Sequence, residues 1–161
     1  SARAVVMGLS NLNIKKVTII SRNESTLNIF VKSTRNLLSK RDISIESINN
    51  KKLNVSPYIQ EADLIINTTP IGMNGSQAKQ ESVPLGHEVW DCLSNKTILY
   101  DLIYTPRPTN WLKIGQQKNC FTIDGLDMLV EQGAFSIRLW TGFHDVPVQT
   151  MKSSAEKHLM V

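Results

Sequence analysis

The sequence predicts an α/β domain in which a parallel sheet carries helices on both faces, the doubly wound arrangement. Short runs of apolar and β-branched residues alternate with segments whose apolar residues recur at helical spacing. This alternation continues along the chain without an internal repeat, a low-complexity tract or an inter-domain linker. Repeated strand, helix and strand units build parallel sheets with right-handed crossovers, which is why the order of elements predicts this fold.

The first part of the chain contains three predicted strands and the helices around them. Lys16–Ile20 is apolar on both faces, as expected of a strand that is covered on both sides. The helix after it has an apolar stripe that includes Leu27, Val31 and Leu38. The predicted elements are a helix over 2–12, a strand over 16–20, a helix over 24–40, a strand over 42–48, a helical turn over 56–62 and a strand over 63–67.

The second part begins with a polar, glycine-containing stretch over 74–86 and then resumes the same alternation. Pro147 suits the first turn of the last helix, since a missing N–H costs nothing there. The predicted elements are a short helix over 87–94, a strand over 97–104, a helix over 108–118, a strand over 120–124, a long helix over 126–142 and a final helix over 146–160.

The composition is that of an ordinary soluble globular domain, with 41% hydrophobic and 20% charged residues. No apolar run approaches the length of a membrane span. The net charge is +4, but the basic residues are scattered and lack interleaved aromatics, so we expect no nucleic-acid partner. Cys92 and Cys120 are far apart and the histidines are scattered, so we expect two buried free thiols and no metal site.

The residues just past each strand are the candidates for function, because ligands of doubly wound sheets bind at the carboxyl ends of the strands. The first such end is Ser21-Arg22-Asn23. A guanidinium can bind a phosphate through two hydrogen bonds, and a nearby Arg distinguishes NADP sites from the acidic NAD sites. A simple helix cap by Ser21 or Asn23 explains part of this triplet equally well and is compatible with the functional role.

The second end is the segment Asn67–Met73, with the sequence NTTPIGM. Pro70 cannot donate to a strand ladder, and Gly72 permits a turn with positive φ. Thr68 and Thr69 present hydroxyls, so the loop could line a cofactor; a plain connection to a helix is the alternative.

Two further strand ends carry Tyr104 and Gly125. A phenol at the cleft can hydrogen-bond a carboxylate or hydroxyl, although buried tyrosines are common. Gly125 could let a flat ligand ring approach the backbone. Gln132 lies two helical turns after Gly125 on the same, otherwise apolar face, where it would need a polar partner; an amide at the edge of the core is the alternative.

Taken in order, the segments SRN, NTTPIGM, YDLIYTPRPT and GLDMLVEQGAF closely resemble the nucleotide-binding half of shikimate dehydrogenase. The opening SARAVV is similar to the residues that follow the glycine-rich turn in that family. The resemblance covers nearly the whole chain. It implies a Rossmann-type, NADP-binding domain over 1–161 of an oxidoreductase that reversibly reduces 3-dehydroshikimate to shikimate, within chorismate and aromatic amino-acid biosynthesis.

The resemblance also implies roles for individual residues, which fall into a cofactor group and a substrate group. Those implied to bind the cofactor are Ser1 at the pyrophosphate, Ser21, Arg22 and Asn23 at the 2′-phosphate, Asn67, Thr68 and Thr69 along the cleft, and Leu102 and Gly125 beside the nicotinamide. Those implied to reach the substrate are Tyr104 and Gln132. Members of the family often have a second basic residue where this chain has Thr26, so the phosphate would be bound more weakly or shared with another Arg or Lys.

The resemblance further implies what the chain lacks: the first strand, the glycine turn, and the substrate domain with its proton-transferring Lys and Asp. The C-terminal helices would pack back on the substrate side. We therefore expect no catalytic residue in this chain, marginal folding alone and no activity alone. An NAD-dependent quinate/shikimate dehydrogenase and a non-catalytic nucleotide-binding module stay open as alternatives. The resemblance implies a cytoplasmic protein, or a plastid one in a plant or alga; it leaves the oligomeric state open.

Overall fold

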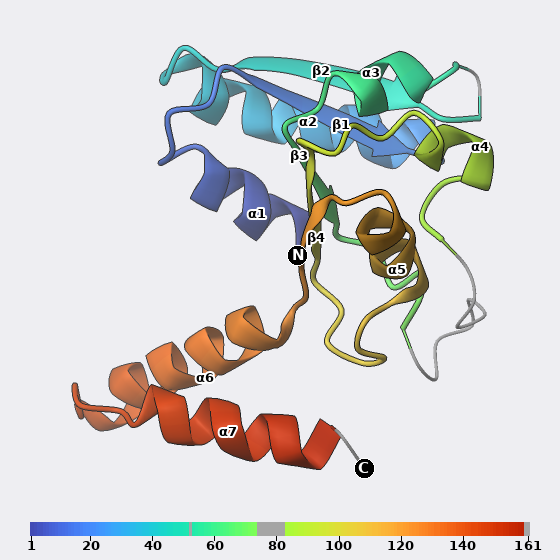
Figure 1. The fold of residues 1–161 in the computed structure, drawn as a ribbon. Helices are drawn as coiled ribbons and strands as arrows, with labels where there is room; N and C mark the ends of the chain where they lie inside the picture. The colour runs from blue at the N-terminus through green and yellow to red at the C-terminus, as the bar shows by residue number, and fades with distance from the viewer. Residues whose placement is uncertain (52, 74–82, 160–161) are drawn as a thin grey trace. The chain divides into compact units, whose positions relative to one another are not determined.

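A computed structural model describes residues 1–51, 53–73 and 83–159, and the chain divides into two compact units, Ser1–Gln60 and Glu61–Val161. Figure 1 shows the elements of each unit. Most of the polar stretch predicted over 74–86 lies outside the described residues. Within the described ranges, no helix is long and apolar enough to cross a membrane.

The first unit is a two-stranded parallel sheet with helices. Its elements are α1 (Ala2–Leu9), β1 (Lys16–Ser21), α2 (Glu24–Ser39), β2 (Ser44–Asn49) and α3 (Ser56–Gln60). Strands β1 and β2 pair in parallel from Lys16 beside Ser44 to Ser21 beside Asn49, so both strands end at the same level. The core joins α1, α2 and the sheet through buried side chains at Val6, Val17, Leu38 and Ile43.

The second unit is a three-stranded parallel sheet in the order β3-β4-β5. Its elements are β3 (Leu64–Asn67), α4 (His87–Trp90), β4 (Ile98–Asp101), α5 (Asn110–Gln117), β5 (Phe121–Ile123), α6 (Leu126–Thr141) and α7 (Val148–Leu159). Its core centres on Trp90 and Trp111, whose ring centroids are 5.3 Å apart, and on Leu99 and Leu126, neither of which is exposed to solvent. The fold class is confirmed: parallel strands alternate with helices.

The strand pairing differs from one continuous sheet. Strands β1 and β3 each have one strand partner among the described residues, β2 and β4 respectively.

Several predicted boundaries were wrong by a few residues. The helix predicted over 2–12 ends at Leu9, and the strand predicted from residue 42 begins at Ser44, because Asp42 has a positive φ of 57°. The strand predicted to reach Tyr104 ends at Asp101. The two thiols are free, as predicted; Cys120 is buried, but the predicted burial of Cys92 was wrong, because its side chain is partly exposed.

Candidate functional site

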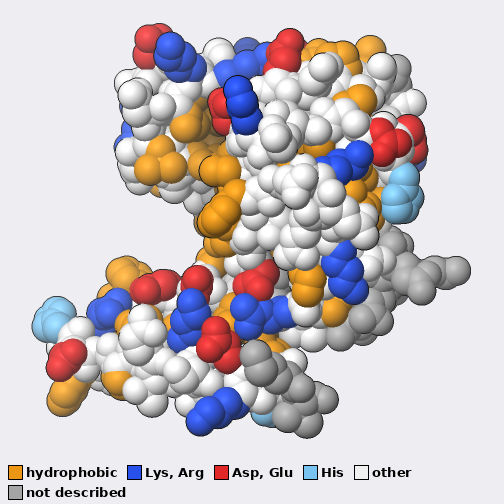
Figure 2. All heavy atoms as spheres, viewed as in Figure 1, with side chains coloured by type: hydrophobic (Ala, Val, Ile, Leu, Met, Phe, Trp, Pro, Cys, Tyr) orange, Lys and Arg blue, Asp and Glu red, His pale blue; other side chains and the backbone are white. Residues whose placement is uncertain are grey.

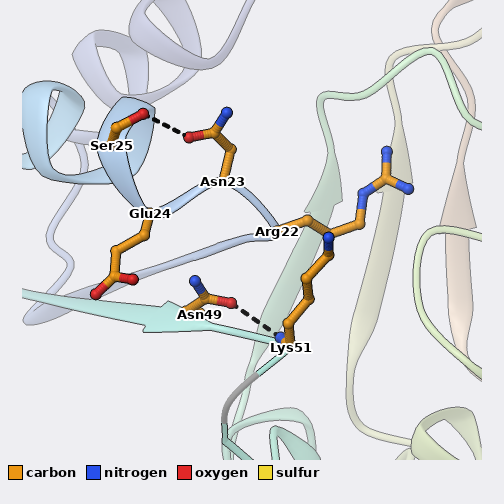
Figure 3. Close-up of a pocket in the computed structure, with 6 residues that line it drawn as sticks. All are labelled: Arg22, Asn23, Glu24, Ser25, Asn49 and Lys51. Carbon is orange, nitrogen blue, oxygen red and sulfur yellow. Dashed lines mark hydrogen bonds between the residues drawn. The ribbon is translucent and has the colours of Figure 1, made fainter.

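A pocket lies at the carboxyl ends of β1 and β2, entirely within the first unit. Its lining residues, drawn in Figure 3, are Arg22, Asn23, Glu24, Ser25, Asn49 and Lys51. Its volume of about 640 Å³ falls in the range of small-ligand pockets, about 300–1,000 Å³. This is the β1–β2 pocket, and it contains two of the three residues predicted to hold a 2′-phosphate.

The turn after β1 is built by Asn23. Its side-chain Oδ1 accepts hydrogen bonds from the backbone N–H of Thr26 (3.1 Å) and from the Ser25 hydroxyl (2.8 Å), and so caps the N-terminus of α2. The Ser21 hydroxyl accepts a hydrogen bond from the Asn23 N–H at 3.2 Å. The cap that the sequence suggested is therefore present, and it leaves the Arg22 guanidinium without a hydrogen-bond or ion-pair partner among the described residues.

In the second unit, the loop after β3 is organised by Asn67. Its Oδ1 accepts hydrogen bonds from the Thr69 N–H (3.0 Å) and the Thr69 hydroxyl (2.7 Å), while its Nδ2 donates to the Ile71 carbonyl (3.2 Å). Gly72 has the positive φ that the sequence predicted, 98°. The strand ends at Asn67, three residues before Pro70. Side-chain hydrogen bonding by Asn67, and not Pro70 alone, therefore turns the chain away from the sheet.

Asp101 is the centre of a buried hydrogen-bond network, and sequence reasoning assigned it no role. It lies beside Asn67 in the register of β3 and β4 and is fully buried. Its Oδ1 accepts from Asn67 Nδ2 and from the Ile103 N–H, each at 3.1 Å. Its Oδ2 accepts from the Thr109 hydroxyl at 2.7 Å and from the indole N–H of Trp111. A lone acid within an apolar strand was the available signal.

Burial and hydrogen bonding act on the pKa of Asp101 in opposite directions. Desolvation raises the pKa above its ordinary value of 3.8, and this effect is larger than the lowering by the four hydrogen-bond donors. Because one donor, Asn67, comes from the end of β3 and the other three come from residues 103–111, the carboxyl ties the end of β3 to the segment that follows β4.

Gly125 lies directly against the backbone that follows β4. A Cβ at this position would be 2.1 Å from the carbonyl oxygen of Leu102, and the Gly125 N–H donates to the Ile103 carbonyl at 3.0 Å. An ion pair between Arg107 and Asp124 (2.7 Å) joins the same two loops. The chain's own backbone thus gives Gly125 a reason to lack a side chain, whereas the sequence suggested a ligand ring.

Three other predicted residues lie in less constrained positions. Tyr104 is 38% exposed. It comes directly after Ile103, whose N–H donates to the buried Asp101 carboxylate. Gln132 is exposed on α6, so it does not need the polar partner that a buried amide would. Ser1 precedes α1 as its N-cap residue, but its hydroxyl makes no capping hydrogen bond.

The structure therefore forms two groups of predicted residues. Ser21, Arg22 and Asn23 are together at the end of β1. In the second unit the Leu102 N–H donates to the Asn67 carbonyl at 3.2 Å, which with the Gly125 contact brings the strand ends of β3, β4 and β5 together. Besides Asp101, sequence reasoning missed Lys51, for which a position two residues past β2 was the only signal.

The parallel strands, the helical crossovers and the polar turns at the strand ends define the class of protein, a Rossmann-type α/β domain. Residues 125–156 match the family model described as the shikimate 5′-dehydrogenase C-terminal domain. Over 99% of its length the chain is 43% identical to a shikimate dehydrogenase (NADP(+)) of Prochlorococcus marinus, covering 54% of that relative. It is 36% identical to one of Nostoc sp., covering 53%.

The chain is thus related to the shikimate dehydrogenases over almost its whole length, which confirms the resemblance suggested by the sequence motifs. It spans about half the length of the curated relatives that it matches. Two solved structures share the fold. Quinate dehydrogenase from Corynebacterium glutamicum with NAD has a TM-score of 0.80 at 23% identity, covering 96% of this chain and 50% of that one. Shikimate 5-dehydrogenase from Listeria monocytogenes with shikimate and NAD has 0.78 at 24%, covering 96% and 52%.

Proposed function

We propose that the chain is the NADP-binding part of a shikimate dehydrogenase that reversibly reduces 3-dehydroshikimate to shikimate with NADPH. The observation that carries the proposal is the uncommitted Arg22 guanidinium in the β1–β2 pocket. A 2′-phosphate needs such a partner at this strand end. The relatives that are similar over 99% of the chain, and are named as NADP(+) enzymes, support the same cofactor.

The residues of the β1–β2 pocket fit a phosphate monoester. The Asn23 cap orients the first turn of α2, whose backbone N–H groups carry a partial positive charge toward the pocket. Arg22 would bind the phosphate through paired hydrogen bonds. Ser21 and Asn23 fix the turn on which Arg22 lies.

In the second unit, the strand ends would hold the nicotinamide and the substrate. The Asn67 side chain is 4% exposed and is used within its loop, so contacts with a cofactor would fall to Thr68, Thr69 and the backbone. NADPH supplies the hydride when it is bound. Leu102 and Gly125 would flank the nicotinamide, and the Tyr104 hydroxyl and Gln132 amide would hydrogen-bond the substrate.

We propose that α6 and α7 pack against the substrate-binding part of the protein. Phe135 and Leu139 lie one turn apart on α6, Phe143 lies just past its end, and with Trp140 they are 64–80% exposed. Figure 2 shows hydrophobic side chains at the surface of this helix pair. Several large apolar side chains exposed near one helix end are typical of an interaction surface. The proton-transferring Lys and Asp of the family would come from that part, so this chain alone would be inactive.

An NAD-dependent quinate or shikimate dehydrogenase is the second candidate. One observation favours it: Glu24 also lines the β1–β2 pocket, and a carboxylate at this strand end can bind the ribose 2′-hydroxyl of NAD. A non-catalytic nucleotide-binding module would bind cofactor but show no turnover. The proposal places the protein in the cytoplasm, with small-molecule partners and no nucleic acid.

The test is steady-state kinetics of the full-length protein with NADP⁺ and NAD⁺ in the direction of shikimate oxidation. We expect kcat/KM to favour NADP⁺. Arg22→Asp should lower kcat/KM for NADP⁺ by about 10–100-fold, the worth of one or two charge-assisted hydrogen bonds, and should spare NAD⁺. Arg35→Asp, an exposed exchange of the same charge on α2, is the control. Unchanged cofactor preference in Arg22→Asp would contradict the assignment, and a wild-type preference for NAD⁺ would favour the second candidate.

A further inference from the structure

The β1–β2 pocket contains a second cation besides Arg22. Ser21 and Asn49 are register partners at the ends of β1 and β2, so both strands end at the same level of the sheet. Arg22 is one residue past β1 and Lys51 two residues past β2. Both line the pocket, and in Figure 3 the Lys51 side chain extends toward Arg22.

The Asn23 and Asn49 side chains that line this pocket hydrogen-bond the backbone of the turns after β1 and β2. Asn23 Oδ1 is used by the α2 cap, and Asn49 Oδ1 accepts a hydrogen bond from the backbone N–H of Lys51 at 3.0 Å. The Asn49 contact fixes the backbone from which the Lys51 side chain extends. Among the described residues, neither the Lys51 ammonium nor the Arg22 guanidinium has a hydrogen-bond or ion-pair partner.

Arg22, Lys51 and the carboxylate of Glu24 line the pocket, so its lining has a net positive charge that favours an anionic ligand. A phosphate monoester carries a charge of about −1.5 to −2 at pH 7, which two cations stabilise more than one does. The guanidinium offers a planar pair of donors and the ammonium a compact point charge, so the two groups are complementary. Thr26 cannot take this role, because its N–H and its hydroxyl both donate to Asn23.

We propose that Lys51 supplies the second positive charge that binds the 2′-phosphate, together with Arg22. This inference rests on the proposed function, since it assumes that the phosphate of NADP enters the β1–β2 pocket. It assigns cofactor selectivity to both strand ends, whereas the residues that the sequence singled out by number for the 2′-phosphate all lie after β1.

The test measures binding of two probes to the full-length protein by calorimetry: adenosine 2′,5′-bisphosphate and adenosine 5′-monophosphate. They differ only by the 2′-phosphate. We expect Lys51→Gln to weaken binding of the bisphosphate about tenfold, as loss of one charge-assisted contact should, and to leave the monophosphate unchanged. Lys51→Arg should keep most of the affinity. Lys32→Gln, an exposed lysine on α2, is the matched control and should affect neither probe.

Arg22→Gln separates failure of the inference from failure of the proposed function. If Arg22→Gln weakens bisphosphate binding while Lys51→Gln does not, the NADP proposal stands and the role of Lys51 is refuted. Equal losses for both probes in Lys51→Gln would also refute it, because the effect would not depend on the 2′-phosphate. If the wild-type protein binds both probes equally well, both the inference and the NADP proposal are wrong.

Discussion

Replacing Asp101 by Asn tests whether the buried network holds the second unit together. The two side chains have the same shape, but Asn has one oxygen where the carboxyl has two. If the Asn oxygen faces Asn67 and Ile103, the amide nitrogen faces the indole N–H of Trp111, which cannot accept a hydrogen bond. If the amide is turned round, its nitrogen faces the backbone N–H of Ile103 instead.

At least one buried donor is therefore left without a partner in Asp101→Asn. The Thr109 hydroxyl can rotate to accept, so it adds no second loss. An unsatisfied buried donor costs about 1–3 kcal/mol, and we expect the free energy of unfolding to fall by about that amount. Asp145→Asn, at an exposed aspartate in the same unit, should change it by less than about 0.5 kcal/mol.

Urea unfolding of the full-length protein, followed by tryptophan fluorescence, measures this change. The three tryptophans of this chain, Trp90, Trp111 and Trp140, all lie in the second unit, so their contribution to the signal reports on that unit. The midpoint should shift with an unchanged m value. In a Trp111→Phe background the unpaired donor is absent, so Asp101→Asn should cost less there than in the wild type. A loss below about 0.5 kcal/mol in the wild-type background would refute the reasoning.

Two more predictions concern Gly125, with Gly8 as its comparison, and the pH dependence of stability. Gly125→Ala should lower the free energy of unfolding by about 1–3 kcal/mol, because its Cβ would lie 2.1 Å from the Leu102 carbonyl oxygen. Gly8→Ala, with no heavy atom within 4 Å of the added Cβ, should stabilise the protein by about 0.5–1 kcal/mol. Urea unfolding followed by circular dichroism measures both changes. Normal stability with lost cofactor binding in Gly125→Ala would restore the ligand explanation for this glycine. The second prediction concerns how the stability contributed by Asp101 depends on pH. Since the folded-state pKa of Asp101 is raised above 3.8, its contribution to stability is fully present below pH 3.8 and is lost as the pH rises through the raised value. The stability difference between wild type and Asp101→Asn should therefore widen from pH 7.5 toward pH 4, and a difference that narrows would contradict the raised pKa.

Local patterns in the sequence were sufficient to predict the order of the elements and much of the turn chemistry. The positive φ of Gly72 and the Asn23 cap depend on residues within a few positions, and both are present in the structure. Element ends were less predictable. The strand through Tyr100 was expected to reach Tyr104 because alternation continues past its end, but Asp101 terminates it through contacts with Thr109 and Trp111.

Residues whose roles depend on distant partners could not be predicted. Asp101 hydrogen-bonds a side chain that is 34 positions away, and Lys51 shares a pocket with Arg22 because β1 and β2 pair in one register. The need for glycine at position 125 likewise arises from the backbone at Leu102. These contacts cannot be predicted from the spacing of residues along the sequence, because they form only when the strands pair in the fold.

The loop that Asn67 closes is ordered before any ligand arrives. Its turn is held by hydrogen bonds within the chain, so the loss of conformational entropy occurs during folding and does not recur on binding. A ligand that contacts Thr68 or Thr69 would meet a preorganised surface, and its affinity would not be reduced by the ordering of a flexible segment.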